Sequence, residues 1–213
     1  RSLVGSEMCI RDRLNPVYDY ATVDETKLDT NQFNWGYDPK NYNSPEGSYS
    51  TDPYNGDVRV KEFKEMVKTL HDNDISVVMD VVYNHTYSTD YCYNKLVPDY
   101  FYRPGSNGSG CGNDVASERA MVRNFIVDSV AYWAKEYHID GFRFDLVGLI
   151  DVQTIKEIRA ALDEIDPSII IYGEGWSMTT TTTKEGTALS TQTNAVNLGN
   201  FGMFNDTIRD AIK

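Results

Sequence analysis

The sequence predicts an α/β fold built on a parallel sheet, because apolar strands alternate with amphipathic helices along its middle. Three largely apolar runs, at residues 75–82, 139–146 and 169–172, have the length and composition of buried parallel strands. The segments between them carry apolar side chains at helical spacing. Parallel strands need crossover connections, so these helices are expected to cover the sheet.

Three amphipathic helices are predicted from capping residues and periodicity. The first begins at Asp57 and ends near Asn73. The second opens at Ser117. The third is capped by Asp151 and ends just before Pro167. Each therefore lies in front of or between the predicted strands, as a crossover helix should.

Three connections are long and polar. Residues 15–24 are expected to finish a strand and enter a loop, which continues as an aromatic, Asn/Gly/Pro-rich stretch to residue 54. Such long loops are more often functional than mobile linkers, so a binding surface is favoured. A Gly/Ser/Asn-rich excursion covers residues 87–114, and a Thr-rich loop follows Trp176 up to a final amphipathic stretch at 203–212.

The first 13 residues, RSLVGSEMCIRDR, differ in character from the rest and are interpreted as a non-native segment, leaving residues 14–213 as one domain. They contain no apolar core of the signal-peptide kind, so they indicate no compartment. The native N-terminus is expected to be missing.

Charge limits the classes of partner. The formal net charge of −12 would repel nucleic-acid backbones and anionic membrane surfaces, and no apolar run approaches the length of a membrane-spanning helix. A neutral or cationic ligand is favoured. Cys92 and Cys111 lack metal-binding or redox spacing; a disulfide between them and two free thiols both remain open. Nothing in the sequence indicates an oligomeric state.

Candidate catalytic residues lie where the predicted strands end, since reactive side chains in parallel sheets gather at the C-terminal edge. The three strand ends carry Asp80, Asn84 and His85, then Arg143 and Asp145, then Glu174 and Trp176.

The environments of two carboxylates are expected to differ. Arg143 and Asp145 share one face of a strand, and a guanidinium stabilises the charged form that a nucleophile requires. Glu174 stands between glycines beside Trp176, surroundings that would favour the protonated form of a general acid. Glycoside hydrolysis needs such a pair. The alternatives are a purely structural Arg143–Asp145 ion pair, a loop carboxylate at Glu174 and a satisfied buried histidine at His85.

These motifs resemble the α-amylase superfamily, glycoside hydrolase family 13. DVVYNH at 80–85, GFRFDLVG at 141–148 and YGEGW at 172–176 are similar to its first three signature regions, and NWGYDP at 34–39 is similar to a stretch typical of type I pullulanases. The resemblance implies a (β/α)8 TIM barrel, of which this chain would supply roughly strands two to six, with a short loop excursion after strand three. The family's fourth region, a strand ending in His-Asp, is absent.

The resemblance also implies roles for individual residues. Asp145 would be the nucleophile, Glu174 the acid/base and Arg143 the group that orients and ionises the nucleophile. The expected substrate contacts are Tyr37, which would stack beneath the sugar, His85, Trp35 and Trp176. Asp80 and Asn84 are expected to act as supports.

The function that follows is retaining hydrolysis of α-1,6 links in pullulan, starch dextrins or glycogen, by an incomplete catalytic domain that is inactive alone. The partner would be an α-glucan polysaccharide or oligosaccharide. No organic cofactor or metal is predicted, and calcium is suggested only by analogy with the family. Alternatives are an isoamylase-like or α-1,4-acting hydrolase, a non-catalytic sugar-binding relative, and a fragment without function of its own.

Overall fold

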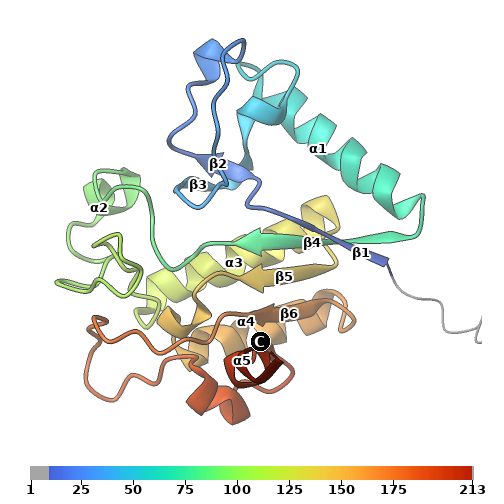
Figure 1. Ribbon diagram of the computed structural model, residues 1–213. Helices are drawn as coiled ribbons and strands as arrows, with labels where there is room; N and C mark the ends of the chain where they lie inside the picture. The colour runs from blue at the N-terminus through green and yellow to red at the C-terminus, as the bar shows by residue number, and fades with distance from the viewer. Residues whose placement is uncertain (1–9, 213) are drawn as a thin grey trace, which may run out of the picture.

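The computed structural model describes residues 10–212 and contains the predicted parallel sheet. Its five strands lie in the order β1-β4-β5-β6-β7 (Figure 1). Their bounds are Ile10–Leu14, Ile75–Val81, Gly141–Phe144, Ile170–Gly173 and Gly202–Met203. All neighbouring strands pair in parallel. A complete (β/α)8 barrel has eight such strands, so the described chain forms part of a barrel, as predicted.

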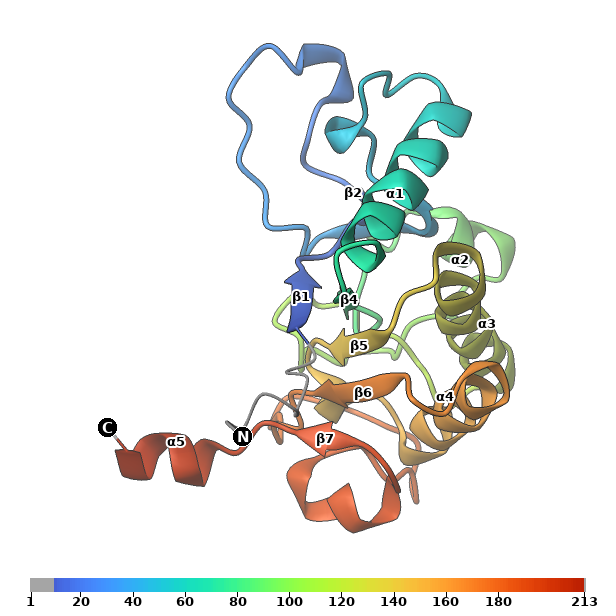
Figure 2. The ribbon, with the colours of Figure 1, turned by 90° about the vertical axis from the view of Figure 1, so that its right-hand side faces the viewer.

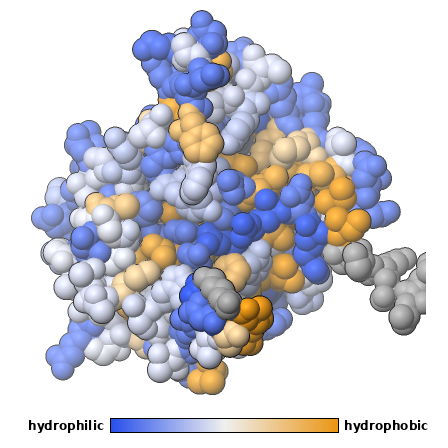
Figure 3. Space-filling view, in the orientation of Figure 1, coloured by the Kyte–Doolittle hydropathy of each residue, from blue (hydrophilic) through white to orange (hydrophobic). Residues whose placement is uncertain are grey.

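Three long helices cover one face of this sheet: α1 (Gly56–His71), α3 (Ala120–Tyr137) and α4 (Val152–Ile165) (Figure 2). Helical spacing turns their apolar side chains toward the strands, and the buried core includes Ile126, Val130 and Trp133 of α3 and Ile155, Ile158 and Leu162 of α4. Within residues 10–212, the opposite face carries no such layer of long helices (Figure 2). Seen face on, it exposes a mixture of hydrophobic and hydrophilic residues (Figure 3).

The helices begin slightly away from their predicted starts. Asn55, rather than Asp57, caps α1, because its side chain accepts a hydrogen bond from the backbone N–H of Asp57. The helix that was expected to open at Ser117 begins at Ala120. Ser117 is buried and bonds to Asp151 instead. The predicted cap Asp151 is confirmed by its bond from the N–H of Thr154.

Strand β1 lies mostly in the first 13 residues, which are interpreted from their sequence as non-native. Ile10 to Leu14 pair in register with Ile75 to Met79 of β4. Exposed arginines interrupt its apolar pattern, so composition alone does not indicate a strand. The remainder of this segment, residues 1–9, lies outside the described residues.

The aromatic stretch expected as one long loop contains a small antiparallel sheet. Its strands are β2 (Tyr18–Tyr20) and β3 (Pro39–Pro45), with irregular register between them. Proline and asparagine are rare in regular strands, so the composition of β3, PKNYNSP, does not indicate a strand. The pair and the loop between its strands project above the large sheet (Figure 1).

The remaining connections contain short elements. The excursion after β4 holds the helix α2 (Cys92–Leu96), and both Cys92 and Cys111 are exposed free thiols. The final amphipathic stretch divides into β7 and the helix α5 (Asp206–Ile212). None of the helices between residues 10 and 212 combines the length and apolar character needed to cross a membrane.

Candidate active site

The polar strand ends meet at one edge of the sheet, because the strands are parallel and in close register. Asp80 of β4 lies opposite Arg143 of β5, which in turn lies opposite Tyr172 of β6. Alternation along β5 places Arg143 on the face opposite to the core residues Phe142 and Phe144. The loops that follow the strands gather beyond this edge (Figure 1).

Arg143 is the centre of the site. Its Nη1 lies 2.9 Å from Oδ1 of Asp80 and 3.1 Å from Oδ1 of Asp145, and its Nη2 lies 2.6 Å from Oε1 of Glu174. The Arg143 side chain is only 8% exposed, which strengthens these interactions relative to a surface pair. One guanidinium therefore holds three carboxylates in place.

Asp80 is in direct contact with Arg143. Its side chain is fully buried, and burial raises its pKa, an effect that the guanidinium of Arg143 opposes. The hydroxyl of Tyr37 donates to Oδ2 of Asp80 over 2.8 Å. Burial and the nearby Asp80 together raise the pKa of Tyr37, so this phenol stays a hydrogen-bond donor.

Tyr37 reaches the cluster through a tight turn in the NWGYDP segment. Gly36 has a φ of +86°, and a Cβ at this position would lie 2.6 Å from the carbonyl oxygen of Pro16. Both facts require glycine. The side chain of Asn34 accepts from the N–H of Gly36 over 2.7 Å and closes the turn.

Asn84 and His85 connect the end of β4 to the nucleophile candidate. Nδ2 of Asn84 donates to both Oδ2 and the backbone oxygen of Asp145, each over 2.9 Å. The ring of His85 lies between Oδ1 of Asn84, at 2.6 Å, and the backbone oxygen of Tyr37, at 3.1 Å. Burial lowers the pKa of His85 and favours the neutral ring. Both partners are oxygen acceptors, so a neutral ring can donate to only one of them, and these two contacts supply no donor for its other nitrogen.

The environment of Glu174 differs from the expectation. An apolar setting was predicted from the neighbouring glycines and aromatic residues. Glu174 instead forms the short ion pair with Arg143 and accepts from the N–H of Leu146 over 3.3 Å. Asp145 and Glu174 therefore share one cation, a contact that depends on the pairing of β5 with β6 and is invisible in local sequence.

The two tryptophans predicted to contact substrate lie outside the hydrogen-bonded cluster. Trp35 is 62% exposed and packs edge-to-face against Phe33, with ring centroids 6.0 Å apart. Trp176 is partly buried, and the guanidinium of Arg209 lies 5.8 Å from its ring. The structure therefore brings together Tyr37, Asp80, Asn84, His85, Arg143, Asp145 and Glu174, but neither tryptophan.

A group of acidic residues outside the site bears on calcium. Among residues 10–212, the carboxylates of Asp19, Glu25 and Glu46 approach within 4.8 Å of one another. Nη2 of Arg59 lies 3.1 Å from Oε2 of Glu25, and Glu46 accepts the N–H groups of Tyr20 and Ser48. Arg59 and these N–H groups serve part of the cluster, whereas Oε1 of Glu25 is buried without a hydrogen-bond partner among the described residues.

The buried carboxylate of Asp114, which lies beside His85, is not among the residues predicted from the sequence. Both its oxygens are hydrogen-bonded, and its backbone pairs with His85 in an isolated antiparallel bridge. The available signal was the run Ser106-Asn-Gly-Ser109 shortly before it, because serine and glycine donors close to an aspartate are typical of a loop closed on a carboxylate.

The chain is similar in sequence to known pullulanases. Pullulanase of Bacillus subtilis strain 168 is 44% identical over 207 residues, which cover 94% of this chain and 28% of that protein. The chain is related to the pullulanases. Pullulanase 1 of Arabidopsis thaliana, a chloroplastic protein, is 39% identical over 84% of this chain and 20% of its own length. No family model matches the chain.

Solved structures give the same result. The crystal structure of Paenibacillus barengoltzii pullulanase in complex with maltohexaose and α-cyclodextrin superposes with a TM-score of 0.92 at 51% identity. That match covers 96% of this chain and 32% of the pullulanase. The chain therefore spans about a third of the length of this relative and carries its α/β architecture.

Proposed function

We propose that this chain is the central part of the catalytic domain of a pullulanase-type enzyme, a retaining hydrolase of α-1,6-glucosidic links and a member of glycoside hydrolase family 13. One observation carries the proposal: Arg143 holds Asp145 and Glu174 together at the C-terminal edge of a parallel sheet. Retaining glycoside hydrolysis uses two neighbouring carboxyl groups, one as nucleophile and one as acid/base. The similarity to pullulanases supports the choice of bond.

Asp145 is the nucleophile in this proposal. Arg143 and Nδ2 of Asn84 contact different carboxylate oxygens of Asp145, and both contacts stabilise its anion. They also fix the direction in which an oxygen lone pair can attack the anomeric carbon. The product of that attack is a covalent glycosyl–Asp145 ester, with the displaced sugar leaving on the opposite side.

Glu174 is the acid/base. As an acid it gives its proton to the leaving oxygen, and its contact with Arg143 sets the position from which it does so. After the ester forms, Glu174 removes a proton from the water that hydrolyses it.

The substrate is an α-glucan in this proposal. Tyr37 presents a partly buried ring at the site, suited to stacking on a sugar face, and Trp35 presents an exposed ring on the same loop. We place His85 on a sugar hydroxyl and Trp176 at the margin of the site. Relatives have been crystallised with maltohexaose, maltotetraose and maltotriose, which supports an oligosaccharide ligand.

We assign no organic cofactor and no catalytic metal to this reaction, because two carboxylates and a guanidinium supply the nucleophile, the proton and the charge stabilisation that it requires. Calcium has no role in any step of this proposal.

The test is a chimera in which residues 14–212 replace the equivalent segment of the Bacillus subtilis pullulanase. Reducing ends released from pullulan and from linear amylose would be measured for the chimera and for its Asp145→Asn variant. We expect pullulan to be cleaved faster, with the variant inactive. Faster cleavage of amylose would favour the α-1,4-acting alternative, and a preference for glycogen over pullulan would favour the isoamylase-like one.

A further inference from the structure

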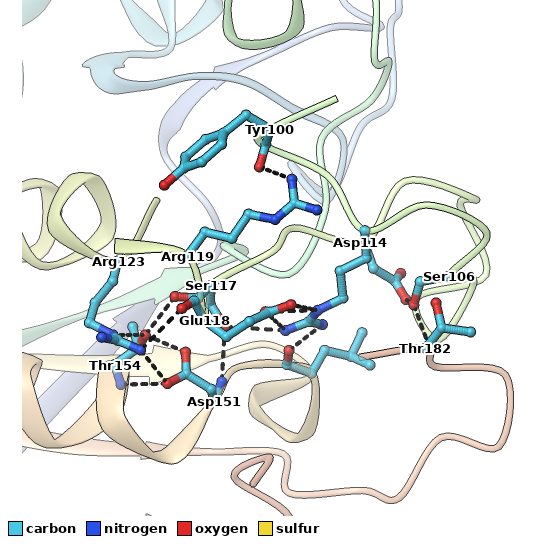
Figure 4. Close-up of polar contacts among 12 residues, drawn as sticks. Tyr100, Ser106, Asp114, Ser117, Glu118, Arg119, Arg123, Asp151, Thr154 and Thr182 are labelled. Atoms are coloured by element: carbon cyan, nitrogen blue, oxygen red, sulfur yellow. Dashed lines mark hydrogen bonds and ion pairs between the residues drawn. The ribbon is translucent and has the colours of Figure 1, made fainter. Parts of the chain in front are cut away.

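Three loops that follow catalytic strands are interlocked by polar contacts (Figure 4). The first is the excursion after β4, the second is the turn between β5 and α4, and the third is the Thr-rich loop after β6. Asp114, in the first loop, bonds to the segment of that loop that contacts the third loop.

The carboxylate of Asp114 organises its own loop. Its Oδ2 accepts from the hydroxyl of Ser106 and, over 2.7 Å, from the N–H of Gly108. Its Oδ1 accepts from the N–H and the hydroxyl of Ser109, over 2.9 and 2.6 Å. Burial tends to raise the pKa of Asp114, but these hydrogen bonds outweigh burial and hold it below its usual value. Asp114 therefore stays ionised and fully bonded.

The segment of residues 106–109, held by Asp114, is hydrogen-bonded to the loop that follows Glu174. Asn107 donates its N–H to the oxygen of Thr180 over 3.0 Å, and the hydroxyl of Thr180 donates back to the oxygen of Asn107 over 2.8 Å. The N–H of Thr182 donates to the hydroxyl of Ser106 over 3.0 Å. A Cβ on Gly108 would lie 2.2 Å from Oγ1 of Thr181 and 2.5 Å from a methyl group of Leu149, so the loops also meet in van der Waals contact.

The backbone beside Asp114 is tied to the active site. Asp114 forms its bridge with His85, and the N–H of Val115 donates to the oxygen of Asn84 over 2.9 Å. Asn84 in turn holds Asp145. A continuous set of contacts thus runs from the nucleophile, through Asn84 and Asp114, to the loop that begins directly after the acid/base.

Arg103 adds a second link. It is buried, and its Nη1 donates to the oxygen of Leu149 over 2.8 Å, while its Nη2 pairs with Glu118 at 2.7 Å. The excursion is thereby attached to the turn that follows Asp145 as well.

We propose that Asp114 is a positioning residue for the acid/base: by locking the Ser106–Ser109 segment onto Thr180–Thr182, it fixes where Glu174 stands relative to Asp145. The proposal rests on the hydrolase function proposed above. Without these contacts the loop after β6 is no longer attached to the excursion, and the position of Glu174 depends on its own bonds to Phe144, Leu146, Gly148 and Arg143.

The test uses the chimera carrying Asp114→Asn. Asparagine keeps the volume but turns an amide NH2 toward two of the donors. We expect kcat on pullulan to fall about tenfold or more, in line with the penalty for misplaced general acids. On an aryl α-maltotrioside, whose good leaving group needs little protonation, the loss should stay within about threefold. Hydrogen exchange at the amides of Asn107 and Thr182 should accelerate.

Two further variants separate positioning from simple loss of stability. Thr180→Val with Thr182→Val removes two exposed hydroxyl bonds, to Asn107 and Pro104, without touching the core, and should give the same substrate-dependent loss more weakly. Glu46→Gln alters another buried carboxylate that accepts backbone N–H groups, in the small β2–β3 sheet, and should lower stability while leaving the ratio of the two substrates unchanged.

Equal losses on both substrates, or unchanged exchange at Thr182, would overturn the positioning role while leaving the hydrolase function standing. A wild-type chimera inactive on every α-glucan would overturn the hydrolase function, and the positioning role with it.

Discussion

Gly148 offers a direct test of how closely the two catalytic strand ends approach. It lies in the turn after Asp145, and a Cβ at this position would stand 2.0 Å from the backbone oxygen of Trp176. Its N–H also donates to the backbone oxygen of Glu174 over 3.1 Å. The variant Gly148→Ala therefore places a methyl group directly against the segment that carries Glu174, the proposed acid/base.

The size of the effect follows from that contact. Real Cβ atoms essentially never approach closer than 3.0 Å, so the two segments must separate by about 1 Å. A misplacement of this size costs about 100-fold in rate, or about 2.7 kcal/mol of activation free energy. The overpacked turn should also lose about 1–3 kcal/mol of stability.

The assay is kcat/KM on pullulan for the chimera, with thermal unfolding measured in parallel. Gly56→Ala is the matched control, because no atom lies within 4 Å of a Cβ at this first residue of α1. We expect the control to keep wild-type activity. Activity of Gly148→Ala within about twofold of the control would show that the close approach of Gly148 to the Glu174 segment does not matter for catalysis.

Three more predictions concern charge. Asp145→Asn should abolish turnover while maltotriose still binds by calorimetry, since it removes a nucleophile and little volume; loss of binding as well would indicate a structural ion pair. Arg143→Gln should cost about 3–5 kcal/mol at pH 7, because Asp80 is left buried without its cation. Its removal raises the pKa of Asp80 further in the folded protein, so the variant should lose stability as pH rises, and urea titrations should show a smaller deficit at pH about 5 than at pH 7. An equal deficit at both would contradict this account. Burial lowers the pKa of His85 below the value of about 6.5 in the unfolded chain, so the stability contributed by the neutral ring is present above that pH and is lost as pH falls below it. Melting temperatures of His85→Gln should therefore fall less steeply with acid than those of the wild type, and parallel curves would argue against a buried neutral ring.

Much of the fold was predictable because its signals are local. The apolar runs that form β4, β5 and β6 are short and rich in residues that favour strands. Asp151 caps α4 by accepting from the N–H of Thr154, only three residues further along the chain. Parallel strands align their C-terminal ends, so strand-end residues such as Asp80, Arg143 and Asp145 could be expected at one edge without knowledge of any contact.

The elements that were missed lack such signals. β1 carries exposed charges on an edge, and β3 is held by pairing with β2 rather than by strand propensity. The predicted start of α3 was wrong because Ser117, although a typical capping residue, does not cap this helix. Its hydroxyl oxygen instead accepts from the N–H of Asp151 and from Nη2 of Arg103.

Local sequence indicated which side chains stand at the strand ends, among them Asp145 and Glu174. How these side chains interact depends on the tertiary fold. Glu174 pairs with Arg143 across the β5–β6 pair. Ser106, which bonds to Asp114, also accepts from the N–H of Thr182, and Ser106 and Thr182 are 76 positions apart in the chain. Such contacts arise from register and loop packing, which bring distant residues within hydrogen-bond range. The charge around a carboxylate depends on the residues that are close to it in space. The residues next to Glu174 in sequence suggested an apolar environment, but the fold places the guanidinium of Arg143 against it.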